Sequence, residues 1–397
     1  MGRTGLSEKK RKCKTVTVDK ESAEPVVHHG LEGVLAFESE VAFIDGHAPE
    51  LLIRGYDIAD LAHHFGYEQM AYLLLCGRVP SADELAGFQA ELADLRVLPE
   101  PVLDLLRSAP ENAHPMAVLR TAVSLLGVFD PNADAIDPDS LLAAAKSLTA
   151  KFPTLVAAQT RLQAGREPVS PEGAALGHAA NYLYMVDGTA PPEPLRRAFD
   201  AALVLYAEHE TNASTFACRV VVGTMSDMYS AVVAGLGAIK GPLHGGAIDG
   251  AMNMLVEIGS TDRAADYVDA ALAAKRKLPG FGHRVYRAGD PRASELREMA
   301  LEMAAALNGS KGGDSKWFDI AIAAEKRMAE TKGIIPNVDY FAAPVLYQLG
   351  FPLNLMTNVV ASARITGWSA HIIEQYAKNR LIRPRARYTG ERGKRLS

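Results

Sequence analysis

Apolar residues recur at helical spacing along most of the chain. A capping box of Ser81 and Glu84 precedes one such run, whose apolar members fall three or four positions apart. They are Leu85, Phe88, Leu92 and Leu95. The same pattern, rich in alanine and leucine, predicts helices over 116–128, 139–151, 194–207 and 340–349. Prolines between the runs, Pro131 and Pro153 among them, favour short helices.

Strand signals are confined to the first sixty residues. Two apolar runs over 34–44 and 51–54 flank Asp45-Gly46, a dipeptide typical of tight turns, and predict a small hairpin. The chain shows no 34-residue or heptad repeat, which argues against a solenoid or a coiled coil. The predicted fold class is all-α, a multi-helical protein with a small N-terminal β-hairpin.

Composition indicates a globular protein in a reducing compartment. The 397 residues are 48% hydrophobic and 22% charged, and three dispersed cysteines form no C-x-x-C pair. A net charge of -5 predicts no general attraction to nucleic acid or to an anionic membrane. No apolar run approaches the roughly 20 residues of a membrane helix, and no secretory segment follows the N-terminus. We expect a cytoplasmic protein, with residues 1–27 as a flexible basic tail.

The segment 212–239 is rich in glycine, alanine and serine. Small side chains let helix backbones approach closely, so the segment should be buried between helices. A subunit interface and an interior core helix explain it equally well.

Two motifs suggest other enzymes but are incomplete. Gly235, Gly237 and Gly241 are off the dinucleotide-binding spacing by one residue, and no strand precedes them. His209-Glu210 begins like a zinc-protease motif, but Ala213 stands where the second histidine would be. We therefore expect neither a nicotinamide site nor a metal.

Four clusters in the second half carry candidate chemistry. His209, His244, His283 and Asp339 each lie near glycine, proline or asparagine, residue types that favour loops at helix ends. These residues predict acid–base chemistry on an anion. Three arginines near proline or glycine could hold carboxylates bidentately or form surface salt bridges. They are Arg292, Arg364 and Arg383.

From Gly30 to Gly390 the chain resembles the citrate synthase family. The resemblance rests on short motifs that occur in the family's order and spacing. They are Gly30-Leu-Glu-Gly33, His114-Pro-Met, H-x-x-N-x-S at 209–214, Gly241-Pro-Leu-His244-Gly-Gly, Gly280-Phe-Gly-His283-Arg-Val-Tyr, Asp290-Pro-Arg292, Asn337-Val-Asp339 and Leu381-Ile-Arg383-Pro.

The resemblance implies a two-domain helical fold. Residues 28–240 and 350–397 would form a large domain, and residues 241–349 a small domain that closes over the active site. It also implies an acyltransferase that condenses acetyl-CoA with oxaloacetate and hydrolyses citryl-CoA to citrate, at the entry to the tricarboxylic acid cycle. Acetyl-CoA would be a co-substrate, with no tightly bound cofactor and no metal. The family's active form implies a homodimer.

The resemblance also assigns catalytic roles. Asp339 would remove a proton from the acetyl-CoA methyl group, and His244, kept neutral, would donate a hydrogen bond to the thioester oxygen. His283 would polarise the oxaloacetate keto oxygen and protonate it.

Substrate-binding roles are implied in the same way. His209, Arg292, Arg364 and Arg383 would hold oxaloacetate, with Arg383 contributed by the partner subunit. Arg287 and Lys275 flank the glycine-rich loop at 280–283 and are candidates for binding the CoA phosphates.

Two further functions remain open on sequence grounds. A 2-methylcitrate synthase would use propionyl-CoA with the same residues, because one methylene changes binding in an apolar pocket by only about 1–3 kcal/mol. A non-enzymatic helical binding module is a more distant alternative.

The chain departs from the family pattern at two places near the expected site. Family members often carry Asn-Glu where this chain has Ile248-Asp249, and serine where it has Ala342.

Overall fold

A computed structural model describes residues 26–173, 175–283, 285–309 and 315–396. Most of the predicted basic tail, residues 1–25, lies outside the described part. The chain divides into two units, Met1–Glu38 with Arg383–Ser397, and Ser39–Ile382. The described residues of the first unit, 26–38 and 383–396, contain a short 3₁₀ helix, η1 (His29–Leu31).

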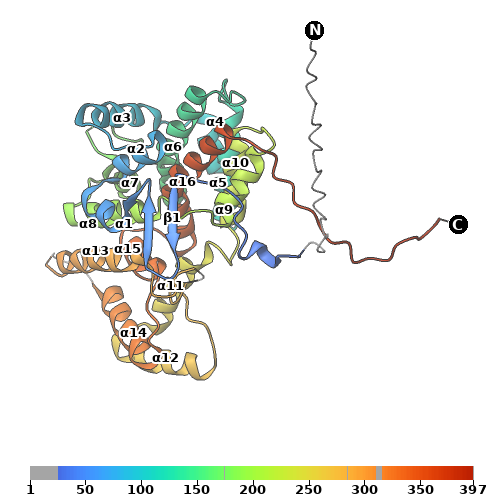
Figure 1. The fold of residues 1–397 in the computed structure, drawn as a ribbon. Coiled ribbons are helices and arrows are strands. Elements are labelled where there is room, and N and C mark those ends of the chain that lie inside the picture. Colours follow the sequence, from blue (N-terminus) through green and yellow to red (C-terminus); the bar gives the residue numbers. More distant parts are fainter. Residues whose placement is uncertain (1–25, 174, 284, 310–314, 397) are drawn as a thin grey trace, which may run out of the picture. The chain divides into compact units, whose positions relative to one another are not determined.

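The second unit is built almost entirely of α-helices, as predicted (Figure 1). Its first eight are α1 (Ile58–His64), α2 (Tyr67–Cys76), α3 (Ala82–Leu95), α4 (Glu100–Ser108), α5 (Pro115–Val128), α6 (Pro138–Gln163), α7 (His178–Asp187) and α8 (Glu193–Tyr206). The next eight are α9 (Ala213–Val222), α10 (Met228–Ile239), α11 (Gly246–Ile258), α12 (Ala264–Ala273), α13 (Pro291–Asn308), α14 (Lys316–Lys332), α15 (Val338–Gln348) and α16 (Met356–Ala377). Two 3₁₀ helices, η2 (Thr261–Arg263) and η3 (Leu353–Leu355), complete the set.

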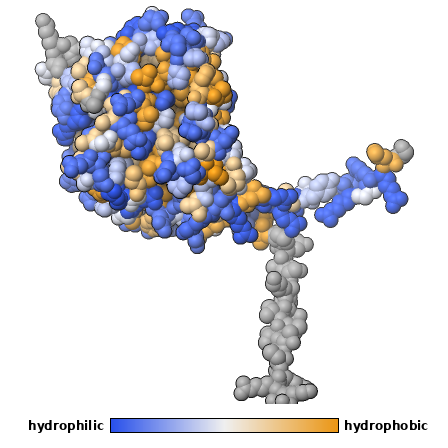
Figure 2. Space-filling model, turned by 90° about the horizontal axis from the view of Figure 1, so that it is seen from above, coloured by the Kyte–Doolittle hydropathy of each residue, from blue (hydrophilic) through white to orange (hydrophobic). Residues whose placement is uncertain are grey.

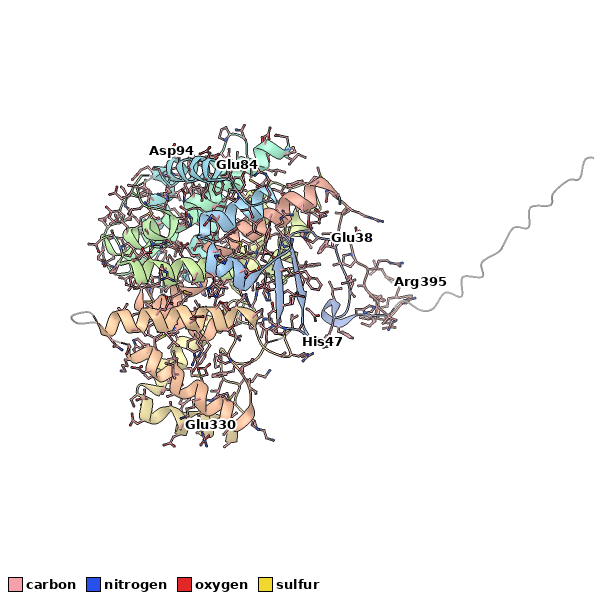
Figure 3. The ribbon with its side chains drawn as sticks, turned by 60° about the vertical axis from the view of Figure 1, so that its left-hand side comes forward. Glu38, His47, Glu84, Asp94, Glu330 and Arg395 are labelled. Carbon is pink, nitrogen blue, oxygen red and sulfur yellow. The ribbon has the colours of Figure 1, made fainter. Side chains whose placement is uncertain are left out.

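The predicted hairpin is present but shorter than expected. Strands β1 (Ala42–Asp45), β2 (Glu50–Ile53) and β3 (Tyr56–Asp57) form an antiparallel sheet in that order. The carboxylate of Asp45 accepts hydrogen bonds from the backbone N–H groups of His47 and Ala48, which closes the turn. Figure 3 shows His47 at the tip of this hairpin.

Helix α16 is the centre of the core. Every residue from Met356 to Ile372 is buried, and the helix packs against α2, α6, α8, α9 and α10. A helix that is covered on all sides must satisfy its polar side chains internally. Arg364 and His371 on α16 are therefore expected to have specific partners.

The prediction of a helix break near Pro153 is wrong. Helix α6 continues through Pro153, although an interior proline costs about 3 kcal/mol. The residues around it, including Phe152 and Leu155, are fully buried, so tertiary packing offsets the lost hydrogen bond. Pro344 lies inside α15 in the same way.

Helices α11, α12, α14 and α15 pack mainly on one another, whereas α13 packs on α8 as well as on α15. Helix α12 packs on α14, and α15 packs on both α11 and α13, while α13 also contacts α8. In Figure 1, α12 and α14 lie together at one end of this unit.

The surface is mixed in polarity. Figure 2 shows hydrophilic and hydrophobic residues interspersed on one face. None of the helices in the described part of the chain combines the length and hydropathy that a membrane span requires.

Candidate active site

The last residue of helix α8 forms hydrogen bonds with two of the predicted site residues. Tyr206 is the last residue of α8, and its backbone carbonyl accepts a hydrogen bond of 2.6 Å from Nε of Arg364 on α16. Its side-chain hydroxyl donates a 2.6 Å hydrogen bond to Oδ1 of Asp339. One tyrosine thus positions a predicted base and a predicted carboxylate-binding arginine.

Two loops that are distant in sequence are tied together beside Asp339. The backbone N–H of Asn337 donates to Gly280 at 2.8 Å, and its side-chain amide donates to the carbonyl of Gly282 at 2.9 Å. Asn337 also caps helix α15 by accepting from the N–H of Asp339 at 3.0 Å. These bonds hold His283, the next residue after Gly282, close to the first turn of α15.

A buried ion pair places the second arginine. Asp290 caps helix α13 and accepts two hydrogen bonds from the guanidinium of Arg292, at 2.9 Å and 2.8 Å. The same carboxylate accepts the N–H of Val338 at 3.1 Å. Arg292 is only 3% exposed, so its charge is paired with Asp290 and fixed beside the start of α15.

The protonation of His283 follows from its contacts. Its Nδ1 accepts backbone N–H groups from Val285 at 3.0 Å and from Tyr286 at 3.2 Å. Because Nδ1 accepts, the neutral ring carries its proton on Nε2. Burial lowers the pKa of His283 to about 4, and the charge of Arg292 contributes to that fall. At neutral pH this imidazole is uncharged and has one N–H to donate.

His244 lies in a tight turn before helix α11. Its backbone N–H bonds to the carbonyl of Gly241 at 2.9 Å, and its Nε2 lies 2.8 Å from Oγ of Ser214. The indole N–H of Trp368 donates to the same hydroxyl at 3.1 Å. Burial and the charge of Arg364 lower the pKa of His244 to about 4, so it is also neutral.

Gly245 allows this turn to close against the core. A Cβ at this position would lie 2.1 Å from the carbonyl oxygen of Ile239 and 2.7 Å from Cγ2 of Thr357. We expect Gly245→Ala to lower the free energy of unfolding by roughly 1–3 kcal/mol, because the backbone must shift. Urea unfolding measures the change.

The neighbouring glycine supplies the control. A Cβ on Gly246, the first residue of α11, would approach only Cβ of Pro242, at 3.7 Å. Gly246→Ala should leave stability within about 1 kcal/mol of the wild type, since alanine favours a helix. Equal losses in the two variants would contradict the steric argument at Gly245.

His209 lies beside His283 and within the electrostatic reach of Arg292 and Arg364. It is buried, and its ring lies 5.4 Å from the ring of His283, centroid to centroid. Burial holds the pKa of His209 well below its ordinary value, and the charges of Arg292 and Arg364 lower it further. The imidazole is therefore neutral beside two cations.

The pKa of Asp339 is subject to opposing effects. Burial raises its pKa above the ordinary aspartate value, while the hydrogen bond from Tyr206 and the charge of Arg292 act against that rise. A desolvated carboxylate of this kind is a stronger base than one in water. The net direction is upward, which suits abstraction of a weakly acidic proton.

A buried relay supports the segment before His209. Arg219 donates to Nδ1 of His371 from Nε at 3.2 Å and from Nη2 at 2.7 Å, so His371 keeps its proton on Nε2. That nitrogen lies 2.9 Å from Oε1 of Glu208. A Cβ on Gly367 would stand only 2.2 Å from Oε2 of Glu208, so the glycine permits this close approach to α16. The relay fixes Glu208 and thereby its neighbour His209.

The structure thus brings together six of the residues predicted from sequence. Hydrogen bonds to the shared partner Tyr206, a ring contact between two histidines, and the electrostatic effect of the charged members on their neighbours link the residues of this group, which we call the acid–base cluster. They are His209, His244, His283, Arg292, Asp339 and Arg364.

Three further predicted residues remain, in two different situations. Arg383 belongs to the first unit, so its expected role stays a prediction. Lys275 and Arg287 are exposed, and within the described residues neither side chain hydrogen-bonds to the cluster. The backbone N–H of Arg287 instead donates to the carbonyl of Gly46 at 2.8 Å, which anchors the loop after His283 to the hairpin tip.

Several site residues were not predicted. Tyr206 has no glycine or proline beside it, and its contact with Asp339 arises only from packing of α8 against α15. Asp249 on α11 is a second carboxyl group affected by the charge of Asp339, and burial raises its pKa to about 6. The sequence signal that could have singled out Asp249 is that it stands where family members often carry glutamate.

Two features elsewhere are separate from this cluster. Cavities of about 500 and 560 Å³ are lined by other residues, around Asp200 and around Lys151 respectively, so cavity volume alone does not mark the site. His63 pairs with Glu295 at 2.7 Å. With Glu298 they form the group of possible metal ligands found among the described residues, and two of the three are exposed.

Comparison with known proteins agrees with the geometry. A family model described as the C-terminal domain of citrate synthase matches residues 30–385. The citrate synthase of Haloferax volcanii is 46% identical over 368 residues, which cover 91% of this chain and 96% of the relative. The 2-methylcitrate synthase of Mycobacterium tuberculosis is 42% identical over 378 residues, covering 95% and 94%.

A solved structure shares the fold. A ternary complex of carboxymethyl coenzyme A and oxaloacetate with the citrate synthase of Thermoplasma acidophilum aligns with a TM-score of 0.86 and 32% identity. The alignment covers 94% of this chain and 98% of that one.

Proposed function

This chain belongs to the citrate synthase family, and from that premise we propose that it condenses acetyl-CoA with oxaloacetate to give citrate and CoA. One observation carries the proposal. A desolvated carboxylate, Asp339, stands in a single cluster with two neutral imidazoles, His244 and His283, and two buried guanidinium groups. This set can abstract a C–H proton, stabilise an enolate oxygen and hold a dicarboxylate.

The first step is enolate formation. Asp339 takes a proton from the methyl carbon of acetyl-CoA, and the thioester oxygen gains charge. A hydrogen bond from His244 stabilises that charge as it develops. Because Nε2 of His244 contacts Ser214, we assign Nδ1 as the donor to the thioester oxygen. In that tautomer Ser214 gives Nε2 the hydroxyl proton that it otherwise donates to Oδ1 of Asn212, which lies 2.7 Å away.

The second step forms the carbon–carbon bond. The nucleophilic methyl carbon attacks the keto carbon of oxaloacetate, and the keto oxygen takes a proton from His283. The Nε2–H of that ring is available because Nδ1 accepts two backbone N–H groups. Water then cleaves the citryl thioester, and CoA leaves as a thiol.

Oxaloacetate is held by cations. Arg292 and Arg364 are buried, and Nε of Arg364 is bonded to Tyr206, which leaves its terminal nitrogens for a carboxylate. His209, whose pKa both charges lower, adds a neutral polar group. Arg383 is proposed to reach the site from the partner subunit of a homodimer, and Arg287 and Lys275 to bind CoA phosphates.

Domain closure is proposed to complete the site. Residues 241–349 contain α11 to α15 and carry His244, His283 and Asp339; of these helices, α11, α12, α14 and α15 pack mainly on one another. Closure of this small domain over bound oxaloacetate would exclude water from the enolate.

Thiol release from acyl-CoA tests the function. We expect release only when oxaloacetate is present, with a higher kcat/KM for acetyl-CoA than for propionyl-CoA. One methylene accounts for a ratio of roughly 10- to 200-fold. Absence of oxaloacetate-dependent release with either acyl-CoA would contradict the proposal and favour a helical binding module.

A second candidate shares the same residues. The 42% identity to a 2-methylcitrate synthase over 95% of the chain favours propionyl-CoA as an alternative acyl donor. A kcat/KM that is higher for propionyl-CoA in the same assay would assign that function instead.

A further inference from the structure

Three aromatic rings form a compact group inside the acid–base cluster. Tyr286 lies 4.7 Å from the ring of His283 and 5.6 Å from the ring of His209, centroid to centroid. Tyr286 follows His283 by three residues, and its backbone N–H is one of the two donors to Nδ1 of that histidine. The tyrosine ring therefore stands beside two proposed oxaloacetate ligands.

Two polar atoms of this group have no partner among the described residues. They are the hydroxyl oxygen of Tyr286 and Nε2 of His209, both buried. Tyr286 is 3% exposed and His209 is 9% exposed. Buried polar groups in folded proteins almost always find a partner, and each exception needs an explanation. A bound ligand with several oxygen atoms could supply the missing partners of both the Tyr286 hydroxyl and Nε2 of His209.

The surroundings suit an anionic ligand. Burial raises the pKa of Tyr286, although the charge of Arg292 acts against the rise, so the hydroxyl keeps its proton and can donate it. Asp290 and Glu210 also influence this group, but the carboxylate of Asp290 is already occupied by Arg292. The tyrosine is a neutral donor close to a fixed cation.

We propose that the Tyr286 hydroxyl is a further substrate-binding group, which donates a hydrogen bond to an oxygen atom of bound oxaloacetate beside His209. The inference rests on the proposed function and deepens it by adding a specificity determinant for the 2-oxo dicarboxylate. A site that donates to a substrate oxygen discriminates against analogues that lack it, because the buried donor is then unpaired.

Tyr286→Phe tests the proposal. The substitution removes the hydroxyl and keeps both the ring contacts and the backbone N–H that holds His283. We expect the Kd and KM for oxaloacetate to rise roughly tenfold or more, the scale of a hydrogen bond to a charged group. The KM for acetyl-CoA should stay within about twofold.

Thermal stability separates binding from a structural role. A hydroxyl without a protein partner adds nothing to the free enzyme, so the Tm of ligand-free Tyr286→Phe should equal or exceed that of the wild type. The rise in Tm on adding oxaloacetate should be smaller in the variant.

Tyr182→Phe is the matched control. Tyr182 is also buried, but its hydroxyl is hydrogen-bonded to Ser362 at 3.2 Å. This variant should show a lower Tm and an unchanged affinity for oxaloacetate.

Two outcomes would overturn the inference. If the wild type binds oxaloacetate and releases thiol, but Tyr286→Phe binds oxaloacetate equally well, this inference fails and the proposed function stands. If the wild type neither gains stability from oxaloacetate nor releases thiol, the proposed function fails, and the inference fails with it.

Discussion

Replacing Asp339 with asparagine is expected to lower kcat by about 10²-fold or more. Asparagine keeps the shape of the side chain and can still accept the hydrogen bond from Tyr206, but it cannot take a proton. The loss should therefore fall on the chemical step, with the KM for oxaloacetate little changed. Oxaloacetate-dependent thiol release from acetyl-CoA measures it.

Asp249 provides the control for this experiment. It is another carboxyl group near the cluster with a raised pKa, about 6, and it lies 3.2 Å from the hydroxyl of Thr357. Asp249→Asn should lower kcat by less than about tenfold if Asp339 is the base. Near-normal turnover in Asp339→Asn, or an equal loss in Asp249→Asn, would remove Asp339 from its proposed role.

The helical architecture could be predicted from sequence because its signals are local. The capping box of Ser81 and Glu84 is present at the start of α3, with the Ser81 hydroxyl accepting the N–H of Glu84. Helix α5 starts at Pro115, one residue from its predicted start, because proline suits the first turn. Pro153 misled the prediction because burial of a whole turn is a tertiary effect, which local propensity does not contain.

The candidate site could be predicted only in part. Histidines and an aspartate beside loop-forming residues suggested acid–base chemistry, and the family resemblance supplied their roles. The structure adds the bonds that no local pattern encodes, such as the contact of Asn337 with Gly280 and Gly282. These bonds join segments more than fifty residues apart, so their existence depends on the packed fold.

The supporting residues were the hardest to predict. Glu208, in the loop after α8, and His371, on α16, are fully buried polar residues of types that are mostly exposed in proteins. Their burial is possible because Arg219 holds His371, because His371 donates to Oε1 of Glu208, and because Gly367 has no side chain to block the carboxylate. Such a relay becomes apparent only when all its members are placed.

His244→Ala is the second substitution expected to have a large effect, with a loss in kcat of about 10²-fold or more. Alanine removes the donor proposed to stabilise the enolate oxygen, and one such donor accounts for about 10²- to 10³-fold in other enzymes. Because burial lowers the pKa of His244 to about 4, the wild-type group acts as a neutral donor, and the loss should vary little between pH 6 and pH 8.

The amide variant His244→Asn makes this prediction sharper. An asparagine N–H lies near the position of the imidazole Nδ1 and can donate to the same oxygen, so this variant should retain more activity than His244→Ala. The oxaloacetate Kd should stay within about twofold of the wild type in both variants, because other residues bind that substrate. If alanine and asparagine lose activity equally, or if both weaken oxaloacetate binding tenfold, His244 supports the structure of the site and does not act as the enolate donor.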